Sequence, residues 1–469
     1  MKTPVAPAMS PTKRDEAVRE LIDSLPAKTV VTDPDLLAVQ SRDRADIITP
    51  GAAIAAVLAR TTDDVVTAVM WADRHGIPVV PRGAGSGLSG GATAVDGCLV
   101  VSVARMTSIL EINPDNFTAR VEPGVINADL NRAVAEFGLM YAPDPSSHEI
   151  SSIGGNLATN AGGLRCVKYG VTRQHVREVT VVLPDGSVLT TGHQTVKGVA
   201  GLDLLGLFIG SEGTLGVITE AVVSLIPKPA GEPVTVMAGF PDVDSAMVAV
   251  AAAMRAGADP EMMEFMDQRT LRAIDAWKGT DFGDYAAMIL SQTNGPEATR
   301  RAGLIQDCFT AAGVVDVLAA EDPAEGAQLI EIRRMAYPAT ERMGHMLTED
   351  VCVPLTKLSD MMRAVDEIAK KHNVQVYTIG HAGDGNLHPS IVWTGGAVHE
   401  MPENVWAAAT DMFRAAMALG GTVTGEHGIG TLKQAFLGEE LGEVGTAVQR
   451  AVKEALDPKG LFNPGKALA

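Results

Sequence analysis

The 469-residue chain has few aromatic side chains, few cysteines and no long apolar run. Aromatic residues make up 4% of the chain, whereas glycine occurs 48 times, a balance that favours a glycine-rich α/β enzyme over a binding scaffold. The four cysteines, Cys98, Cys166, Cys308 and Cys352, are far apart in sequence and form no CxxC pair, so we expect free thiols in a reducing compartment. No run approaches the roughly 18–20 apolar residues of a membrane span, and the first residues lack the apolar core of a secretory signal. These absences predict a soluble, cytoplasmic protein.

Positive charge is also scarce, since the formal net charge is −19 at pH 7. Nucleic acids and anionic membrane surfaces are bound through basic patches, so this composition argues against both as partners. An acidic ligand would have to be attracted by a local cation. Apolar residues form 46% of the chain, which is ample for a large core and for two or more domains.

The apolar pattern divides the chain into four parts. Residues 1–48 read as a helical lead-in, and residues 49–228 alternate strands and helices. A stretch rich in proline and glycine, 227–233, marks a boundary. Residues 229–420 then start a second series of strands separated by helices, which predicts an α+β domain whose sheet is covered on one face. Residues 421–469 form a C-terminal segment.

The stretch YTIGHAGDGNLHPSIVW, Tyr377–Trp393, places two histidines on either side of an Asp-Gly pair. Asp-Gly between two β-prone runs favours a two-residue type I′ hairpin, in which His381 would lie directly opposite His388. Directly opposed side chains share a face with Cβ atoms roughly 4.5–5.5 Å apart, and two imidazoles at that spacing can bind one metal ion. Two polar residues on a solvated hairpin remain the alternative for this stretch alone.

The segment PVVPRGAGSGLSGGA, Pro78–Ala92, contains a G-x-G-x-x-G pattern at Gly85, Gly87 and Gly90. A Rossmann loop must open directly into a helix whose N-terminus holds the pyrophosphate. Here a turn and another strand follow, so we reject a nicotinamide-binding fold. Successive glycines still let backbone N–H groups converge on a phosphate, and a purely structural turn would not need so many.

Two later loops, Pro143–Thr172 and Phe208–Thr219, have the same glycine-rich character. Three loops of this kind in one domain indicate a large dinucleotide that lies extended along it.

Six motifs in order make the chain resemble a known family: PRGAGSGLSGG, PSSHEISSIGGNLATNAGG, GSEGTLGVIT, GHAGDGNLHP, GEHGIG and LDPKGLFNPGK. It is similar, from about residue 45 to the end, to the FAD-linked 2-hydroxy-acid dehydrogenases, the group of glycolate oxidase large subunits, D-lactate dehydrogenases and D-2-hydroxyglutarate dehydrogenases. That group belongs to the vanillyl-alcohol oxidase/p-cresol methylhydroxylase superfamily. The resemblance implies an α+β fold, with a two-subdomain FAD-binding domain over 49–228 that recruits the C-terminal segment, and an α+β substrate (cap) domain.

The resemblance also implies which residues hold FAD. The first loop would hold the pyrophosphate, the second would contact the dinucleotide and ring, the third would hold the adenosine side, and Asn463 would return to the flavin. No histidine lies between Arg82 and Ala92, so we expect FAD to be bound non-covalently. The residues implied are Arg82, Gly83, Ala84, Gly85, Ser86, Gly87, Leu88, Ser89, Pro145, Ser146, Gly154, Gly155, Thr159, Asn160, Gly162, Gly163, Glu212, Gly216, Ile218 and Asn463.

The GEHGIG motif supplies a third metal ligand, because the family carries its metal on positions that match His381, His388 and Glu426. Two imidazoles and one carboxylate suit several divalent ions, zinc and manganese first among them, and leave positions for substrate. The neighbouring His427 would be the catalytic base, with a structural, helix-capping role as the alternative. The expected reaction is proton removal by His427 and hydride transfer from C2 to flavin N5, which gives a 2-keto acid.

The family pattern places the substrate-carboxylate arginine at Arg333, with Tyr337 one helical turn later on the same face. An ordinary solvated helix face is the alternative. Thr348 and Glu349 stand where members acting on 2-hydroxyglutarate carry a lysine, which favours lactate, glycolate or a longer monoacid as substrate.

Two other hypotheses remain on this evidence. One is a related flavoprotein that works without the metal; the other is a non-catalytic or partner-dependent FAD-binding subunit of a glycolate-oxidising complex. The natural electron acceptor is left open between a quinone, a cytochrome, electron-transfer flavoprotein and oxygen, and the chain could meet the inner membrane through it. A homodimer is one oligomeric state to test.

Overall fold

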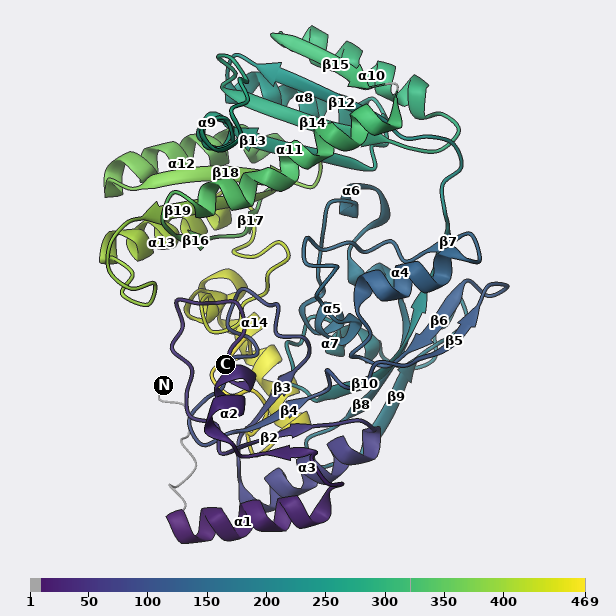
Figure 1. The fold of residues 1–469 in the computed structure, drawn as a ribbon, viewed down its shortest axis with the longest axis vertical. Coiled ribbons are helices and arrows are strands. Elements are labelled where there is room, and N and C mark those ends of the chain that lie inside the picture. The colour runs from purple at the N-terminus through teal and green to yellow at the C-terminus, as the bar shows by residue number, and fades with distance from the viewer. Residues whose placement is uncertain (1–9, 321, 469) are drawn as a thin grey trace. The chain divides into compact units, whose positions relative to one another are not determined.

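The computed structural model describes residues 10–320 and 322–468. The chain folds into two compact units (Figure 1). The first unit contains the residues up to Gly162, then Val171–Lys228 and the segment from Glu426 onwards. The second contains Gly163–Gly170 and Pro229–Gly425. No pattern in the sequence indicates that the eight residues Gly163–Gly170 belong to the second unit.

The lead-in to the first unit contains a short strand as well as helices. The elements of this unit are α1 (Pro11–Ser24), β1 (Val30–Val31), α2 (Pro34–Gln40), β2 (Ala55–Leu58), α3 (Thr62–His75), β3 (Val79–Arg82), β4 (Leu99–Ser102), β5 (Ile109–Asn113), β6 (Thr118–Val121), α4 (Asn127–Ala135), β7 (Leu139–Met140), α5 (Ile153–Thr159), η1 (Thr172–His175), β8 (Val176–Val182), β9 (Val188–Gly192), α7 (Leu205–Phe208), β10 (Val217–Ser224), β11 (Ile226–Pro227) and α14 (Gln434–Leu456).

Two larger sheets and a two-stranded sheet of β7 and β11 build the first unit. The four-stranded sheet has the order β1-β2-β4-β3, and the five-stranded antiparallel sheet has the order β5-β6-β10-β8-β9. Helix α3 covers the smaller sheet because its apolar face buries Trp71 completely against strand residues such as Val57 and Val101. Thr61 caps the start of α3 by accepting the N–H of Asp64, and Gly76, with a left-handed φ of 63°, ends it.

The glycine loop runs from β3 to β4, and these two strands pair in parallel. Among the described residues, no helix lies between Arg82 and Leu99. A Rossmann loop would enter a helix at this point, so the structure confirms that the G-x-G-x-x-G pattern here does not mark a Rossmann fold.

The second unit is built on one large antiparallel sheet with the order β15-β12-β14-β13-β18-β19-β16, and β17 pairs with β19. Its elements are α6 (Cys166–Tyr169), β12 (Val234–Phe240), α8 (Val243–Arg255), β13 (Met262–Asp267), α9 (Gln268–Lys278), β14 (Ala287–Thr293), α10 (Ala298–Ala311), β15 (Asp316–Ala320), α11 (Pro323–Glu341), β16 (His345–Thr348), β17 (Val351–Cys352), η2 (Leu355–Lys357), α12 (Leu358–His372), β18 (Gln375–His381), β19 (Asn386–Trp393) and α13 (Glu403–Ala418).

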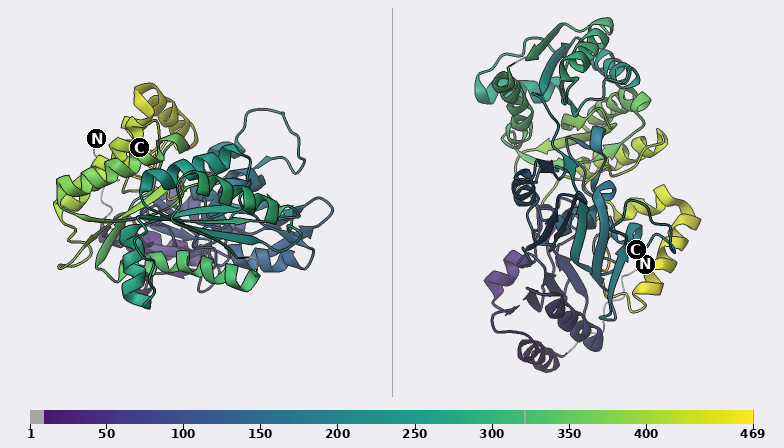
Figure 2. Two further views of the ribbon diagram at one scale, coloured as in Figure 1. Left: turned by 90° about the horizontal axis from the view of Figure 1, so that it is seen from above. Right: turned by 90° about the vertical axis from the view of Figure 1, so that its right-hand side faces the viewer.

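Helices cover both faces of this sheet, so the expectation of one covered face was wrong (Figure 2). Helices α9 and α11 pack on one face, where Ala336 joins Met266 and Ile379 in an apolar core. On the other face Phe309 of α10 packs edge-on against Phe240 of β12, with ring centroids 5.6 Å apart. The five inner strands of the path, β12, β14, β13, β18 and β19, are therefore largely buried, which explains why they are apolar at successive positions rather than at alternate ones, whereas the edge strands β15 and β16 are more exposed.

The hairpin of β18 and β19 differs from the predicted one in its register. His381 pairs with Asn386, and Ile379 pairs with His388, so four residues connect the strands rather than two. The Asp-Gly pair forms the second half of this loop, and Gly385 has a left-handed φ of 81°. His381 and His388 are thus diagonal neighbours on one face instead of directly opposed residues, and such neighbours remain within reach of long or aromatic side chains.

The C-terminal segment adds to the edge of the small sheet in the first unit. The N–H of Val79 donates to the carbonyl of Leu461 at 2.8 Å, and the N–H of Asn463 donates to the carbonyl of Val79 at 2.7 Å. Phe462 between them is 1% exposed and lies in the same apolar core as Trp71.

Candidate functional site

A row of polar side chains crosses the middle of the large sheet in the second unit. Glu264 on β13 lies directly opposite His381 on β18, and His388 on β19 is the diagonal neighbour of His381. Glu264 is fully buried, and the two histidines are 6% and 5% exposed. Buried polar groups of this kind require specific partners, because desolvation without them is costly.

Glu264 connects two of the predicted site residues. Its Oε1 accepts a hydrogen bond from Nδ1 of His381 at 2.8 Å, and its Oε2 accepts one from Nε of Arg333 at 2.9 Å. Arg333 comes from α11, the helix that covers this face of the sheet. The carboxylate places the proton of His381 on Nδ1, so Nε2 keeps a lone pair suited to a metal ion.

A second buried carboxylate stands behind His388. Oδ1 of Asp350 lies 3.8 Å from Nδ1 of His388, which is longer than a hydrogen bond. Asp350 also accepts hydrogen bonds from Nδ2 of Asn386 at 2.8 Å and Oγ1 of Thr424 at 2.7 Å. The imidazole rings of His381 and His388 have centroids 5.2 Å apart. Two buried imidazoles this close, each with its Nδ1 turned to a carboxylate, fit the donor set of a divalent metal.

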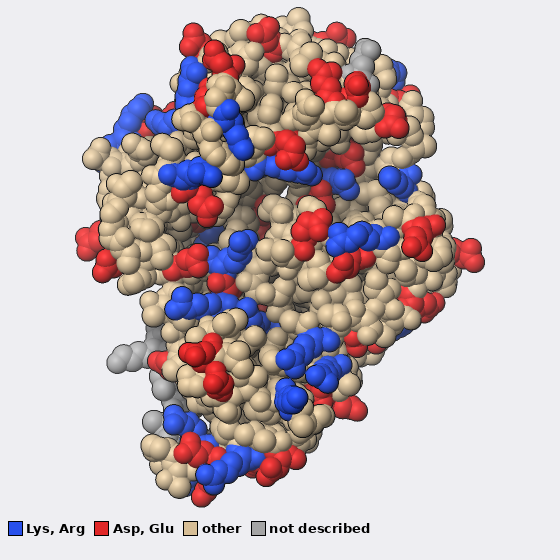
Figure 3. All heavy atoms as spheres, viewed as in Figure 1, with Lys and Arg blue, Asp and Glu red and all other residues tan. Residues whose placement is uncertain are grey.

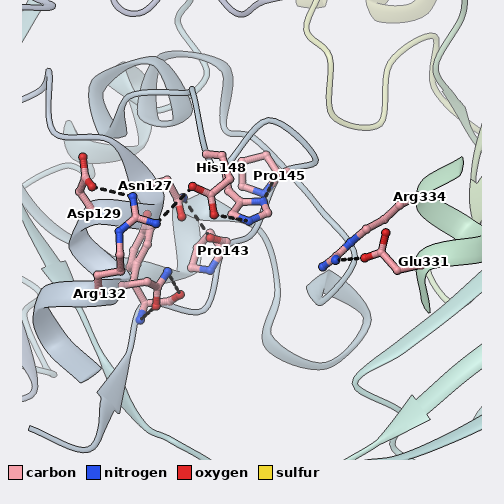
Figure 4. A network of polar contacts seen from close by, with 11 residues as sticks. Asn127, Asp129, Arg132, Pro143, Pro145, His148, Glu331 and Arg334 are labelled. Atoms are coloured by element: carbon pink, nitrogen blue, oxygen red, sulfur yellow. Dashed lines mark hydrogen bonds and ion pairs between the residues drawn. The ribbon is translucent and has the colours of Figure 1, made fainter. Parts of the chain in front are cut away.

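The neighbouring arginines of α11 have different environments. The side chain of Arg333 is 10% exposed, whereas that of Arg334 is 60% exposed and pairs with Glu331 on its own helix (Figure 4). Arg333 is thus a buried cation, whereas Arg334 is a solvated one. Tyr337 follows one turn later and is 38% exposed. Thr348 contacts Ser390 across the strands, with 3.0 Å between their hydroxyl oxygens.

Glu426 and His427 begin the last segment of the first unit, directly after Gly425 in the chain. Nε2 of His427 lies 3.7 Å from Oε1 of Glu426. The backbone carbonyl of His427 accepts a hydrogen bond from Oγ of Ser89 at 3.0 Å. The GEHGIG segment is therefore attached to the first glycine loop.

The first glycine loop is shaped by side chains around it. Oγ of Ser152, the N-cap of α5, accepts the N–H of Ala84 at 3.2 Å and that of Gly155 at 3.4 Å. Gly85 has a left-handed φ of 75°, and a Cβ there would collide with the guanidinium of Arg82. Burial lowers the pKa of Arg82, whose Nη1 donates to the carbonyl of Arg42. The first glycine loop thus presents backbone groups rather than bulky side chains, which fits the binding of a pyrophosphate.

Hydrogen bonds from nearby side chains hold two points of the second glycine-rich loop in place (Figure 4). Nδ2 of Asn127 donates to the carbonyl of Pro143 at 3.0 Å, and Nδ1 of His148 lies 3.1 Å from the carbonyl of Pro145. Ser146 lies between these fixed points. The predicted cofactor residues Pro145 and Ser146 therefore lie on a loop that is fixed by a side chain of α4, Asn127, and by one of its own side chains, His148.

Two residues predicted to contact FAD, Glu212 and Asn463, also connect parts of the first unit. The carboxylate of Glu212 accepts the N–H groups of Ile429 and Gly430 at 2.7 and 2.8 Å. Burial raises the pKa of Glu212, and these N–H groups oppose that effect. Nδ2 of Asn463 donates to the carbonyls of Gly91 and Glu212 at 2.8 and 2.7 Å. These contacts join the first and third glycine loops to the C-terminal segment.

The remaining predicted cofactor residues lie at turns, on helix α5 or, in the case of Ile218, on β10. Asn160 ends α5 with a left-handed φ of 53°, and Thr159 donates to the carbonyl of Gly155 at 3.0 Å. A Cβ on Gly162 would come within 2.5 Å of Oε2 of Glu426, so glycine is required there. Gly163 begins the short segment that belongs to the second unit. The other predicted positions are Gly83, Ser86, Gly87, Leu88, Gly154, Gly216 and Ile218, of which Gly154 lies on α5 and Ile218 on β10.

Charged residues of both signs are interspersed on the surface of each unit in the view of Figure 3, without one continuous basic patch. Among the described residues, no helix is both long and apolar enough to span a lipid bilayer.

Comparison with known proteins defines the class. Residues 53–192 match an FAD binding domain, and residues 231–467 match the C-terminal domain of FAD linked oxidases. The structure matches a 4-ethylphenol oxidase from Gulosibacter chungangensis in complex with isoeugenol and a p-cresol methylhydroxylase with substrate bound, each with a TM-score of 0.81 and 98% of both chains covered. Their identities of 19% and 18% establish the fold alone, the α+β FAD-binding fold of the p-cresol methylhydroxylase type.

Curated relatives narrow the class further. The chain is 41% identical over 419 residues to the glycolate oxidase subunit GlcD of Bacillus subtilis, which covers 88% of this chain and 89% of that protein. It is 32% identical over 472 residues to a D-lactate dehydrogenase of Anaerostipes hadrus, with 96% and 97% covered. It is 34% identical over 460 residues to a D-lactate dehydrogenase of Archaeoglobus fulgidus, with 95% and 99% covered. The chain belongs to the FAD-linked oxidase family, and it is an FAD-linked oxidoreductase.

The sequence did not single out two buried carboxylates that lie next to the predicted site residues, Glu264 and Asp350. A signal for Glu264 was present, because it is a lone carboxylate at the third position of the apolar strand MMEFMD. Charged residues are almost never fully buried unless they are paired, so a glutamate there predicts a buried partner.

Proposed function

We propose that this protein oxidises a D-2-hydroxy acid, D-lactate, glycolate or a related monoacid, to the 2-keto acid in a reaction that depends on FAD and a divalent metal. The observation that carries the proposal is the buried row in the second unit, where an arginine, a carboxylate and two histidines lie on one face of the sheet. The arginine is suited to bind a carboxylate and the pair of imidazoles to bind a metal, and together they can recognise the two functional groups of a 2-hydroxy acid.

The predicted metal ligands, the arginine and the base each have a role in this reaction. His381, His388 and Glu426 hold the metal, with zinc or manganese as first choices, and Arg333 binds the substrate carboxylate through its terminal nitrogens. His427 accepts the hydroxyl proton as the C–O bond becomes a carbonyl. When bound, FAD accepts the hydride from C2, and the metal lowers the pKa of the hydroxyl.

The glycine loops of the first unit support the FAD part of this proposal. They present backbone N–H groups and small side chains on which a dinucleotide can lie, and the C-terminal segment fixes two of them. Tyr337, on the face of α11 that Arg333 shares, would contact the substrate side chain.

The test is reduction of an artificial electron acceptor by the purified, flavin-loaded chain with D- and L-2-hydroxy acids, accompanied by metal analysis. Activity on D-lactate or glycolate that disappears with a chelator supports the proposal. Activity that is unaffected by removal of the metal would instead indicate the related flavoprotein chemistry without a metal.

A second candidate function is a partner-dependent or non-catalytic FAD-binding subunit. It is favoured by the names of the relatives in Bacillus subtilis and Escherichia coli, which are glycolate oxidase subunits. Turnover by the isolated chain would contradict it. Restoration of turnover by an added partner protein, or by a quinone or cytochrome acceptor only, would support it.

A further inference from the structure

We infer that Glu264 is a positioning residue that sets the metal ligand His381 and the substrate-binding Arg333 at the same time; this inference rests on the proposed function. The chain Arg333–Glu264–His381 is continuous, with hydrogen bonds of 2.9 and 2.8 Å on the two oxygens of one carboxylate. Neither the sequence motifs nor the resemblance assigned a role to Glu264.

The position of Glu264 makes its carboxylate rigid. It stands in the centre of β13, with its side chain fully buried, and is paired with His381 across one strand boundary. Arg333 reaches it from α11, which packs over the same face through Ala336 and Ala339. A carboxylate held between a sheet and a helix in this way has little freedom to turn.

The contact on His381 has a direct consequence for metal binding. A histidine that donates its Nδ1 proton to a carboxylate has a fixed ring orientation and a more basic Nε2, and loss of such a partner commonly lowers metal affinity by about 10- to 100-fold. Oε1 of Glu264 lies 2.8 Å from Nδ1 of His381, within hydrogen-bond distance, whereas Oδ1 of Asp350 lies 3.8 Å from Nδ1 of His388.

The contact on Arg333 has a consequence for substrate binding. Because Nε is hydrogen-bonded to Glu264, the guanidinium plane is fixed and its two terminal nitrogens form the face that can bind a carboxylate bidentately. Glu264 therefore aligns both His381, proposed to hold the metal that acts on the substrate hydroxyl, and Arg333, proposed to bind the substrate carboxylate.

The test uses the full-length, flavin-loaded protein and the variant Glu264→Gln. Glutamine can accept one of the two hydrogen bonds but turns an N–H₂ group toward the other donor. We expect about 10- to 100-fold weaker binding of Zn²⁺ or Mn²⁺, measured as metal retained against metal-ion buffers, and a larger change in KM than in kcat at saturating metal. Glu331→Gln is the matched control, because it removes the exposed partner of Arg334 and should change neither quantity.

The outcomes separate this inference from the proposed function. Wild-type protein that binds metal, with Glu264→Gln binding it equally tightly and with an unchanged KM, would overturn the inference and leave the proposed function intact. Wild-type protein that binds no metal would overturn both. If Glu264→Gln does not give a folded protein with wild-type flavin content, Glu264→Asp decides: its shorter side chain cannot span both partners, so unchanged metal affinity and KM would overturn the inference, and weakened binding would support it.

Discussion

The imidazole rings of His381 and His388 meet edge to face, with ring centroids 5.2 Å apart and ring planes at 82°. Each ring is almost completely buried, although neither belongs to an apolar cluster. Replacing either histidine with alanine should remove the metal and lower kcat at least about 100-fold, because two protein ligands hold the ion less firmly than three. Flavin content, measured from absorbance, should stay at the wild-type level.

His345→Ala is the control for this experiment. His345 also lies on this sheet and stacks near Trp393, but its Nε2 contacts the carbonyl of Gly396, away from the row. Retained metal in the His381 and His388 variants, or equal loss in His345→Ala, would show that the pair is not the metal site.

The two neighbouring arginines of α11 should respond differently to the same substitution. Arg333→Lys should raise KM for a 2-hydroxy acid about 10-fold or more, because lysine cannot keep both the contact to Glu264 and a bidentate contact to a carboxylate. Arg334→Lys should stay within about twofold, since its exposed ion pair with Glu331 contributes little. Steady-state kinetics on both variants check this. A larger rise in KM for the Arg334 variant would contradict the assignment of Arg333 as the substrate-binding arginine.

Glu212→Gln should destabilise the first unit. An amide can accept only one of the two N–H groups of Ile429 and Gly430 that the carboxylate accepts, and the other is left without its buried acceptor. The expected loss in free energy of unfolding is about 1–3 kcal/mol, measured by urea denaturation. Glu220→Gln, which disrupts a more exposed pair with Arg120, should cost less than about 1 kcal/mol. Equal effects would contradict the proposed role of Glu212 as an attachment point.

The buried side chain of Lys466 should make the stability of the protein depend on pH. Burial lowers the pKa of Lys466 to about 8 in the folded protein, from an unfolded value of 10.5. Between these values the unfolded chain binds more protons, so the contribution of this lysine to the free energy of unfolding rises with pH, by up to about 1.4 kcal/mol per pH unit. Denaturation of wild type and Lys466→Met from pH 7 to 10 should give curves whose difference, wild type minus variant, rises with pH. Parallel curves would contradict the assignment.

The sequence predicted the face of the hairpin better than its register. The observed register differs from the predicted one by two residues. Such a shift leaves His381 and His388 on the same side of the hairpin, because side chains alternate with a period of two. The Asp-Gly rule favoured a two-residue loop, whereas the structure uses four residues, in which Val353 donates its N–H to the carbonyl of Gly385 at 2.9 Å. That bond comes from outside the hairpin, so local turn chemistry could not foresee it.

Long-range pairing explains what the sequence could not show. Glu264 and Arg333 are 69 residues apart, and only the fold brings them together. The eight residues Gly163–Gly170 belong to the second unit through contacts such as Nζ of Lys168 with Oδ1 of Asn294 at 2.6 Å, which no local pattern encodes. The fold class, by contrast, followed from six motifs in order, because glycines with fixed backbone roles tolerate few replacements.

The most direct measurement of the central claim is dye reduction by one flavin-loaded preparation before metal removal, after it, and after the metal is returned. The account predicts oxidation of D-lactate or glycolate in the first state, at least about 100-fold less in the second with flavin still bound, and recovery in the third. Turnover that persists at full rate in the stripped, flavin-loaded protein would contradict it.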